Sequence, residues 1–249
     1  MHVPKSRRTA APLVALLLLA TPAVAQEKQR IPNVQRALAV SAVLAGGSGP
    51  ASVNWIAGGE RFAYTARNPA TQREQIFQYD PASLADQFLF DPHELTLPGT
   101  AGEPLDYESF AWAATGRHVV FQRDFRPIYR HSGIADFLVY DLEADTLLIA
   151  ADDARTAELS PDGTLLGFER GGDLFVYDLV AERERRLTTG GSDTIFNGVF
   201  DWVYEEEFSQ TQAWRWAPDS RRIAFWQTDE RPVPIVQLTD YEGQHPDWV

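Results

Sequence analysis

Four short segments with a shared pattern of apolar and turn-forming residues recur along the chain. Their starts are 57, 47 and 57 positions apart, and each is followed seven and nine positions after its start by two apolar residues. Residues two apart on a strand point to the same face, so each unit is predicted to form strand, turn, strand. The segments are 55–59, 112–116, 159–163 and 216–220, and the apolar pairs are Phe62 and Tyr64, Val119 and Phe121, Leu166 and Phe168, and Ile223 and Phe225.

The turn between the paired strands is clearest at Ser160-Pro161-Asp162-Gly163, which has the residue order of a type I turn. A further strand is predicted in three units, carrying 77–80, 138–141 and 175–178. Units of 40 to 60 residues with three or four strands are typical of propeller blades. The prediction is an all-β fold over 51–249, an incomplete β-propeller with about four blades of a larger, eight-bladed one. A β-sandwich with similar hairpins is the alternative.

The first 25 residues have the features of a Sec-type signal peptide. These are a basic start, an 11-residue apolar run and a small-x-small cleavage pattern, in Lys5, Arg7 and Arg8, in 10–20 and in 23–25. We expect cleavage before Gln26, a periplasmic or secreted location, and an N-terminal segment 26–50 before the first blade. The run is shorter than the roughly 20 residues that span a bilayer, and no cysteine follows it. No stable membrane anchor is therefore expected, with an uncleaved N-terminal anchor as the alternative.

Composition excludes several classes of site. The 249 residues include no cysteine, so disulfides, thiol nucleophiles and cysteine-ligated metals are absent. The formal net charge is −13, and this acidic balance argues against nucleic acid as a partner. No metal-ligand spacing and no phosphate loop occurs, so neither a metal nor a cofactor is expected. The five histidines are scattered at His2, His93, His118, His131 and His245.

The most unusual run is Asp201-Trp202-Val203-Tyr204-Glu205-Glu206-Glu207-Phe208. Adjacent carboxylates repel one another, which favours a place where a cation binds. On a helical turn, neighbouring glutamates diverge by about 100°, and two of them can converge on one ammonium group. Trp202, Tyr204 and Phe208 are expected to pack this turn against the protein, with Asp201 and Glu205 in supporting positions. A solvated acidic loop is the alternative.

This run resembles the glutamate motif of the dipeptidyl peptidase IV family, in the prolyl oligopeptidase superfamily of serine peptidases. In that family the second and third glutamates bind the free α-amine of the substrate, a role that the resemblance gives to Glu206 and Glu207. The segment 129–132 is similar to the one whose arginine contacts a substrate carbonyl oxygen, which implies that role for Arg130. The resemblance covers about 112–236, and it includes 137–142, 213–219, 223–225 and 229–234.

The family's catalytic serine stands in a Gly-x-Ser-x-Gly motif on an α/β-hydrolase domain, and the chain contains no such motif. Segment 46–50 has proline where the motif requires its last glycine, and it is interpreted as a flexible loop. His131 is interpreted as a local hydrogen-bonding residue. No catalytic residue is therefore assigned, and the hydrolase domain is expected to be absent from this chain, leaving it inactive alone.

Three functional hypotheses follow. The leading one is the propeller-forming N-terminal region of an exported bacterial serine exopeptidase that releases X-Pro or X-Ala dipeptides. Its partners would be peptides with a free N-terminus, the missing hydrolase domain and a possible second copy in a homodimer. The alternatives are a stand-alone, non-enzymatic propeller that binds a peptide or protein, and a family member that has lost its nucleophile.

Overall fold

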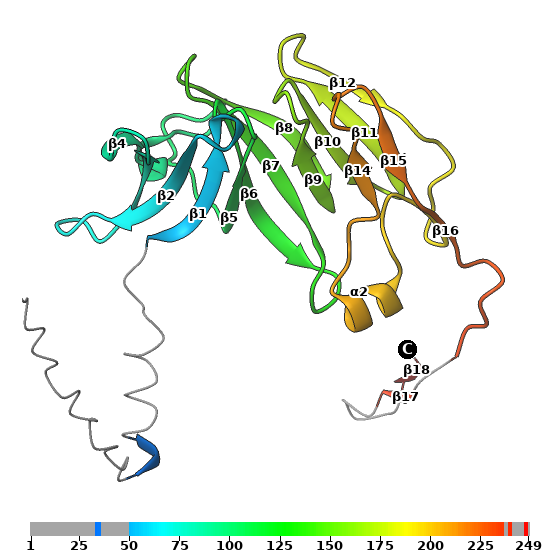
Figure 1. Ribbon diagram of the computed structural model, residues 1–249. Coiled ribbons are helices and arrows are strands. Elements are labelled where there is room, and N and C mark those ends of the chain that lie inside the picture. Colours follow the sequence, from blue (N-terminus) through cyan, green and yellow to red (C-terminus); the bar gives the residue numbers. More distant parts are fainter. Residues whose placement is uncertain (1–32, 36–49, 237–238, 241–246, 249) are drawn as a thin grey trace, which may run out of the picture. The chain divides into compact units, whose positions relative to one another are not determined.

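The computed structural model describes residues 33–35, 50–236, 239–240 and 247–248. The chain divides into two units, Met1–Gly49 and Pro50–Val249, and all the named strands belong to the second one (Figure 1). The predicted signal peptide lies outside the described residues, as does most of the segment 26–50.

Three four-stranded antiparallel sheets follow one another in the second unit, each made of four strands consecutive in sequence (Figure 1). We call them blades 1, 2 and 3. Blade 1 contains β1 (Ala51–Ile56), β2 (Arg61–Arg67), β3 (Glu74–Asp80) and β4 (Ala85–Phe90). Blade 2 contains β5 (Ser109–Trp112), β6 (His118–Pro127), β7 (Gly133–Asp141) and β8 (Thr146–Ala154). Blade 3 contains β9 (Thr156–Leu159), β10 (Leu165–Arg170), β11 (Asp173–Asp178) and β12 (Arg183–Arg186).

The strands after blade 3 form smaller sheets. β13 (Ile195–Asn197) pairs with β16 (Gln227–Asp229), β14 (Trp214–Trp216) pairs with β15 (Ile223–Phe225), and β17 (Thr239–Asp240) pairs with β18 (Asp247–Trp248). The helix α2 (Trp202–Phe208) lies between β13 and β14, and two 3-10 helices, η1 (Ala57–Gly59) and η2 (Pro92–Glu94), lie in loops. The predicted series of propeller-type blades is confirmed, and no sheet closes on itself within the described residues.

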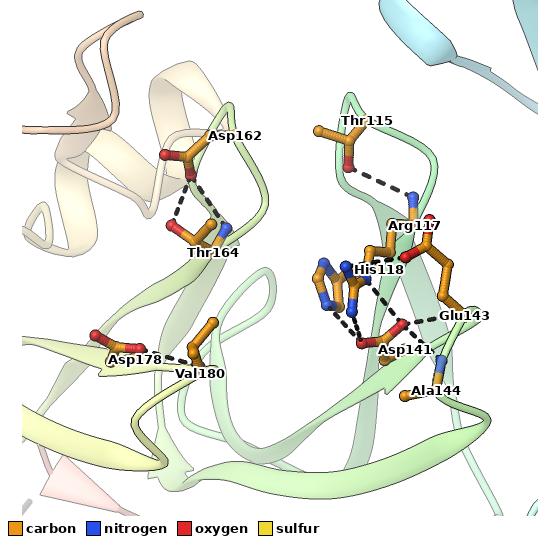
Figure 2. A network of polar contacts seen from close by, with 10 residues as sticks. All are labelled: Thr115, Arg117, His118, Asp141, Glu143, Ala144, Asp162, Thr164, Asp178 and Val180. Carbon is orange, nitrogen blue, oxygen red and sulfur yellow. Dashed lines mark hydrogen bonds and ion pairs between the residues drawn. The ribbon is translucent and has the colours of Figure 1, made fainter.

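A repeated aspartate shapes the end of the third strand in each blade. Asp80, Asp141 and Asp178 are the last residues of β3, β7 and β11, and each side chain accepts hydrogen bonds from the backbone N–H groups two and three residues later. This side-chain turn takes up N–H groups that the strand ladder leaves free. Asp141 also binds Arg117 at 2.6 Å and lies 3.4 Å from His118 (Figure 2).

The predicted type I turn is present between β9 and β10, where the Gly163 N–H donates to the Ser160 carbonyl oxygen at 2.8 Å. The Asp162 side chain accepts from the backbone N–H and the hydroxyl of Thr164 (Figure 2). Gly163 has a φ of +74°, a conformation that favours glycine. Equivalent positions in the other units, Gly59, Gly116 and Ser220, also have positive φ.

The core lies between consecutive blades, and blade 2 is buried on both faces. Val119, Phe121 and Leu138 belong to a cluster shared with blade 1, whereas Val120 and Phe137 belong to one shared with blade 3. Because alternate residues point to opposite faces, a strand covered on both sides is a continuous apolar run. This explains the continuous apolar runs 119–121 in β6 and 137–140 in β7.

The predicted apolar pairs share a face in every unit, but only two pairs are fully buried. In β2 the buried positions are Ala63 and Thr65, while Phe62 and Tyr64 belong to a partly exposed ladder of aromatic rings. In β15, Phe225 is 42% exposed. The spacing therefore predicts the shared face correctly, but not how well that face is covered.

Candidate functional site

The acidic run forms the short helix α2, as the sequence suggested. The Asp201 side chain caps it by accepting a hydrogen bond from the Tyr204 N–H at 3.0 Å. An aspartate at this position satisfies a free backbone donor and complements the positive end of the helix. The helix ends at Ser209, which has a φ of +52° and donates its N–H to the Glu205 carbonyl oxygen.

The aromatic residues of the run do not hold this helix in the way that the sequence suggested. Trp202 is 54% exposed and Phe208 is 62% exposed, so neither is packed into the protein. Tyr204 is partly exposed as well, although its ring stacks on Phe200 with the centroids 4.7 Å apart. The expectation that all three rings anchor the turn is therefore wrong for Trp202 and Phe208.

The helix is anchored instead by Glu205, the one residue of α2 that is fully buried. One of its carboxylate oxygens accepts a hydrogen bond at 2.9 Å from the backbone N–H of His131. His131 belongs to the loop 128–132 that joins β6 to β7 in blade 2. A single side chain thus ties α2 to a loop 74 residues earlier in the sequence.

That same loop carries Arg130, which the structure brings together with Glu206. Arg130 Nη1 lies 3.1 Å from Glu206 Oε2, with the arginine side chain 73% exposed and the glutamate side chain 16% exposed. The loop is closed by the Ser132 carbonyl oxygen, which accepts from the N–H groups of Ile128 and Tyr129. A guanidinium and a carboxylate therefore meet at the surface on two elements that the Glu205–His131 hydrogen bond joins.

Glu207 completes the group of predicted binding residues. It lies one position beyond Glu206 and is exposed, and it forms no ion pair with any residue in the described part of the chain. Asp201 and the three glutamates supply four carboxylates, and two guanidiniums lie close to them, which leaves a net charge of −2. Arg130 faces Glu206 and the other guanidinium faces Glu205, while Asp201 caps α2. Glu207 is therefore the carboxylate left to attract a cation.

The second guanidinium belongs to Arg155, a residue that the sequence did not single out. Arg155 lies between β8 and β9, its Nη2 is 3.7 Å from Glu205 Oε2, and its side chain is 12% exposed. The nearby Glu230 has a raised pKa because of burial and the negative charge of Asp201, an effect that Arg155 opposes. An arginine in a connection between two strands is ordinary in a sequence and does not indicate a buried ion pair. The contact with Glu205 is therefore visible only in the fold.

A comparison with protein families decides the identity of the chain. The model of the dipeptidyl peptidase IV (DPP IV) N-terminal region matches residues 113–248, which is more than half of the sequence. The chain belongs to the dipeptidyl peptidase IV family. It contains the part that corresponds to the N-terminal region of these peptidases, as the acidic motif and the blades indicated.

Individual relatives agree with this membership in the dipeptidyl peptidase IV family. The chain is 29% identical to dipeptidyl peptidase 4 of Trichophyton tonsurans over 176 residues, which cover 69% of this chain and 22% of that protein. The crystal structure of Porphyromonas gingivalis dipeptidyl peptidase 4 is similar with a TM-score of 0.64 and 28% identity, covering 81% of this chain and 28% of the other. The chain thus spans about a quarter of the length of these relatives.

Neither a metal site nor a membrane-spanning helix is found among the described residues. Among the described residues there is no group of three or more His, Asp or Glu side chains placed to hold a metal ion. No helix in the described segments has the length and hydrophobicity that a membrane span requires. His93 packs against Tyr107, and His118, whose pKa is lowered by burial, faces Asp141 in the turn network of blade 2.

Proposed function

We propose that α2 and the Arg130 loop recognise the free amino terminus of a peptide. Glu206 and Glu207 would accept hydrogen bonds from the ammonium group, and Arg130 would donate to the carbonyl oxygen of the first residue. An ammonium has three donors and no acceptor, so more than one carboxylate suits it. The acidic excess of the site and the exposure of Glu207 support this assignment.

The observation that carries the proposal is the contact between Arg130 and Glu206. The α-amine and the carbonyl oxygen of one residue are separated by only two backbone atoms, so their binding partners must lie side by side. An acceptor and a donor 3.1 Å apart meet that requirement. Because an exposed ion pair is worth about 0 to 1 kcal/mol, a ligand can rearrange it at little cost.

At the level of the whole protein, we propose that the chain is the substrate-gating, N-terminus-recognising region of an exported serine exopeptidase. The complete enzyme would release X-Pro or X-Ala dipeptides, with its serine nucleophile on a hydrolase domain. Support comes from the membership in the dipeptidyl peptidase IV family and from the relatives named as dipeptidyl peptidases. In a protein that joins this chain to such a domain, loss of either glutamate should lower kcat/KM.

The binding proposal can be tested on the 249-residue chain with the dipeptide Gly-Pro and its N-acetylated form. We expect the free amine to bind at least about 10-fold more tightly, a difference of about 1.4 kcal/mol. Glu206→Gln and Glu207→Gln keep the side-chain shape but remove one charge each, so both should reduce this preference. Titration calorimetry or NMR shift titration would measure it.

Glu60→Gln is a matched control, since Glu60 is an exposed residue in the turn between β1 and β2. It should leave the preference for the free amine unchanged. Arg130→Gln should weaken both ligands, because both keep the carbonyl group that Arg130 binds. An amine preference that survives in both glutamate variants would contradict the proposal.

A further inference from the structure

A buried carboxylate links the two elements of the proposed site. Glu205 is fully buried, and while one of its oxygens accepts from the His131 N–H, the other has no hydrogen-bond partner among the described residues. Taking an ionised carboxylate out of water is costly unless a cation lies nearby. Among the described residues, the cation in salt-bridge contact with this carboxylate is Arg155.

Arg155 reaches both elements with a single guanidinium. Its Nη2 lies 3.7 Å from Glu205 Oε2 on α2 and 3.4 Å from the hydroxyl oxygen of Ser132, to which it donates, in the loop 128–132. Its own backbone is fixed, because its N–H donates to the carbonyl oxygen of Glu169 at 2.9 Å. The guanidinium is thus held at the junction of blades 2 and 3, between α2 and the loop.

The residues that Arg155 contacts are direct neighbours of those that would touch a ligand. Glu205 precedes Glu206 in α2, and Ser132 lies two residues after Arg130. We infer that Arg155 is a positioning residue for amino-terminus recognition, which holds Glu206 and Arg130 at the separation that a peptide terminus requires. This inference rests on the function proposed above.

The positive charge of Arg155 matters as well as its shape. Burial raises the pKa of Glu169 and of Glu230, and the charge of Arg155 opposes this rise in both. A methionine of similar length would leave these two carboxylates without the nearby positive charge. Lysine keeps the charge, but its ammonium lies on a flexible four-carbon stem and does not reproduce the planar guanidinium whose Nη2 contacts both Glu205 and Ser132. Partial recovery by lysine is therefore expected.

The test uses the 249-residue chain with Arg155→Met and Arg155→Lys, and Arg185→Met as the matched control. Arg185 is exposed on β12 and forms no ion pair with a described residue, so its loss removes an equal charge. Two quantities are measured: the affinities for Gly-Pro and N-acetyl-Gly-Pro, and the hydrogen-exchange rate of the His131 amide. Arg155→Met should weaken Gly-Pro binding and speed His131 exchange, each by at least about 10-fold. Arg155→Lys should restore part of both, and Arg185→Met should change neither.

A double variant guards against loss of folding. Arg155→Met combined with Glu205→Gln removes the uncompensated charge at position 205, so it should be more stable than Arg155→Met alone. Because the contacts of Arg155 with α2 and the loop are still missing, its Gly-Pro affinity should stay low. Recovery of affinity along with stability would overturn the positioning role.

The outcomes separate the inference from the proposed function. If the wild-type chain prefers the free amine and Arg155→Met keeps both that affinity and slow His131 exchange, the inference is overturned while the function stands. If the wild type has no amine preference, the proposed function fails. The exchange rate of His131 then still decides whether Arg155 joins the two elements.

Discussion

Three consecutive glutamates have three different environments in this protein. Glu205 is buried, Glu206 is mostly covered and paired with Arg130, and Glu207 is exposed. The step of about 100° per residue along a helix separates them in this way. The resemblance of the motif to a known family implies binding roles for Glu206 and Glu207, which stay a prediction, but the part played by Glu205 depends on His131 and Arg155, which are distant in sequence. Pattern reasoning had no means of finding that partnership.

Another buried carboxylate makes stability depend on pH. Burial raises the pKa of Glu169 from 4.5 to about 7, although the Gly172 N–H and Arg155 oppose the shift. Below pH 4.5 the group is protonated in both the folded and the unfolded states. As the pH rises from 4.5 to 7 the unfolded chain loses this proton first, so the folded state becomes less stable, by about 3 kcal/mol in total.

We therefore predict that Glu169→Gln stabilises the folded protein more at pH 8 than at pH 4. Glutamine stays neutral at both pH values, so the unfolding free energy of the variant minus that of the wild type should be larger at pH 8 by up to about 3 kcal/mol. Urea denaturation at both pH values would measure it. His118, with a lowered pKa, gives stability that is lost as the pH falls below 6.5, but this effect is common to both proteins and cancels. A pH-independent difference would refute the assignment.

At the scale of elements, the strands were predictable because each blade repeats both its apolar alternation and its turn residues. The Tyr-Asp pairs at 79–80, 140–141 and 177–178 end the third strands, and the aspartates explain why that dipeptide recurs. Helix α2 was predictable as a turn but not in its packing, because Trp202 and Phe208 suggested burial from their chemistry alone. Both lie three residues from Glu205, on the side of the helix that Glu205 occupies, so position along the helix does not predict their exposure.

The turn after β11 allows the role of this aspartate to be measured by itself. Asp178 accepts from the N–H groups of Val180 and Ala181 at 3.0 and 2.8 Å and forms no ion pair with a described residue, unlike Asp141 (Figure 2). Asp178→Ala should lower the unfolding free energy by about 1 kcal/mol, since two N–H groups lose their acceptor. Asp178→Asn keeps a side-chain oxygen and should stay close to wild type. Equal losses in the two variants, measured by urea denaturation, would show that the charge matters rather than the turn.

At the scale of the whole second unit, each blade contacts the next through equivalent turns. A side-chain carbon added at Gly116 would meet Ile56 of blade 1 at 3.1 Å, and one at Gly163 would meet Thr115 of blade 2 at 3.1 Å. The Ser220 hydroxyl continues this series by accepting the Asp162 N–H at 3.0 Å. Blades joined only to their neighbours place distant residues side by side, and so a loop of blade 2 can meet a helix that follows blade 3.

This series of turns predicts a difference between two chemically identical substitutions. Gly59 and Gly163 occupy the same turn position and both have positive φ, so alanine introduces similar backbone strain of about 1 to 2 kcal/mol at each. At Gly59 the new methyl group meets nothing within 4 Å, whereas at Gly163 it also meets His118 at 3.3 Å.

Gly163→Ala should therefore lower the unfolding free energy by about 1 to 3 kcal/mol more than Gly59→Ala, because overpacking adds to the strain. Urea denaturation of both variants provides the comparison. Because the position of His118 would shift, the amide signals of blade 2 should also change in Gly163→Ala and not in Gly59→Ala. Equal losses of stability would mean that the blades are held together by their apolar faces alone. A larger loss at Gly163 would establish that the turns are part of the contact between blades 2 and 3.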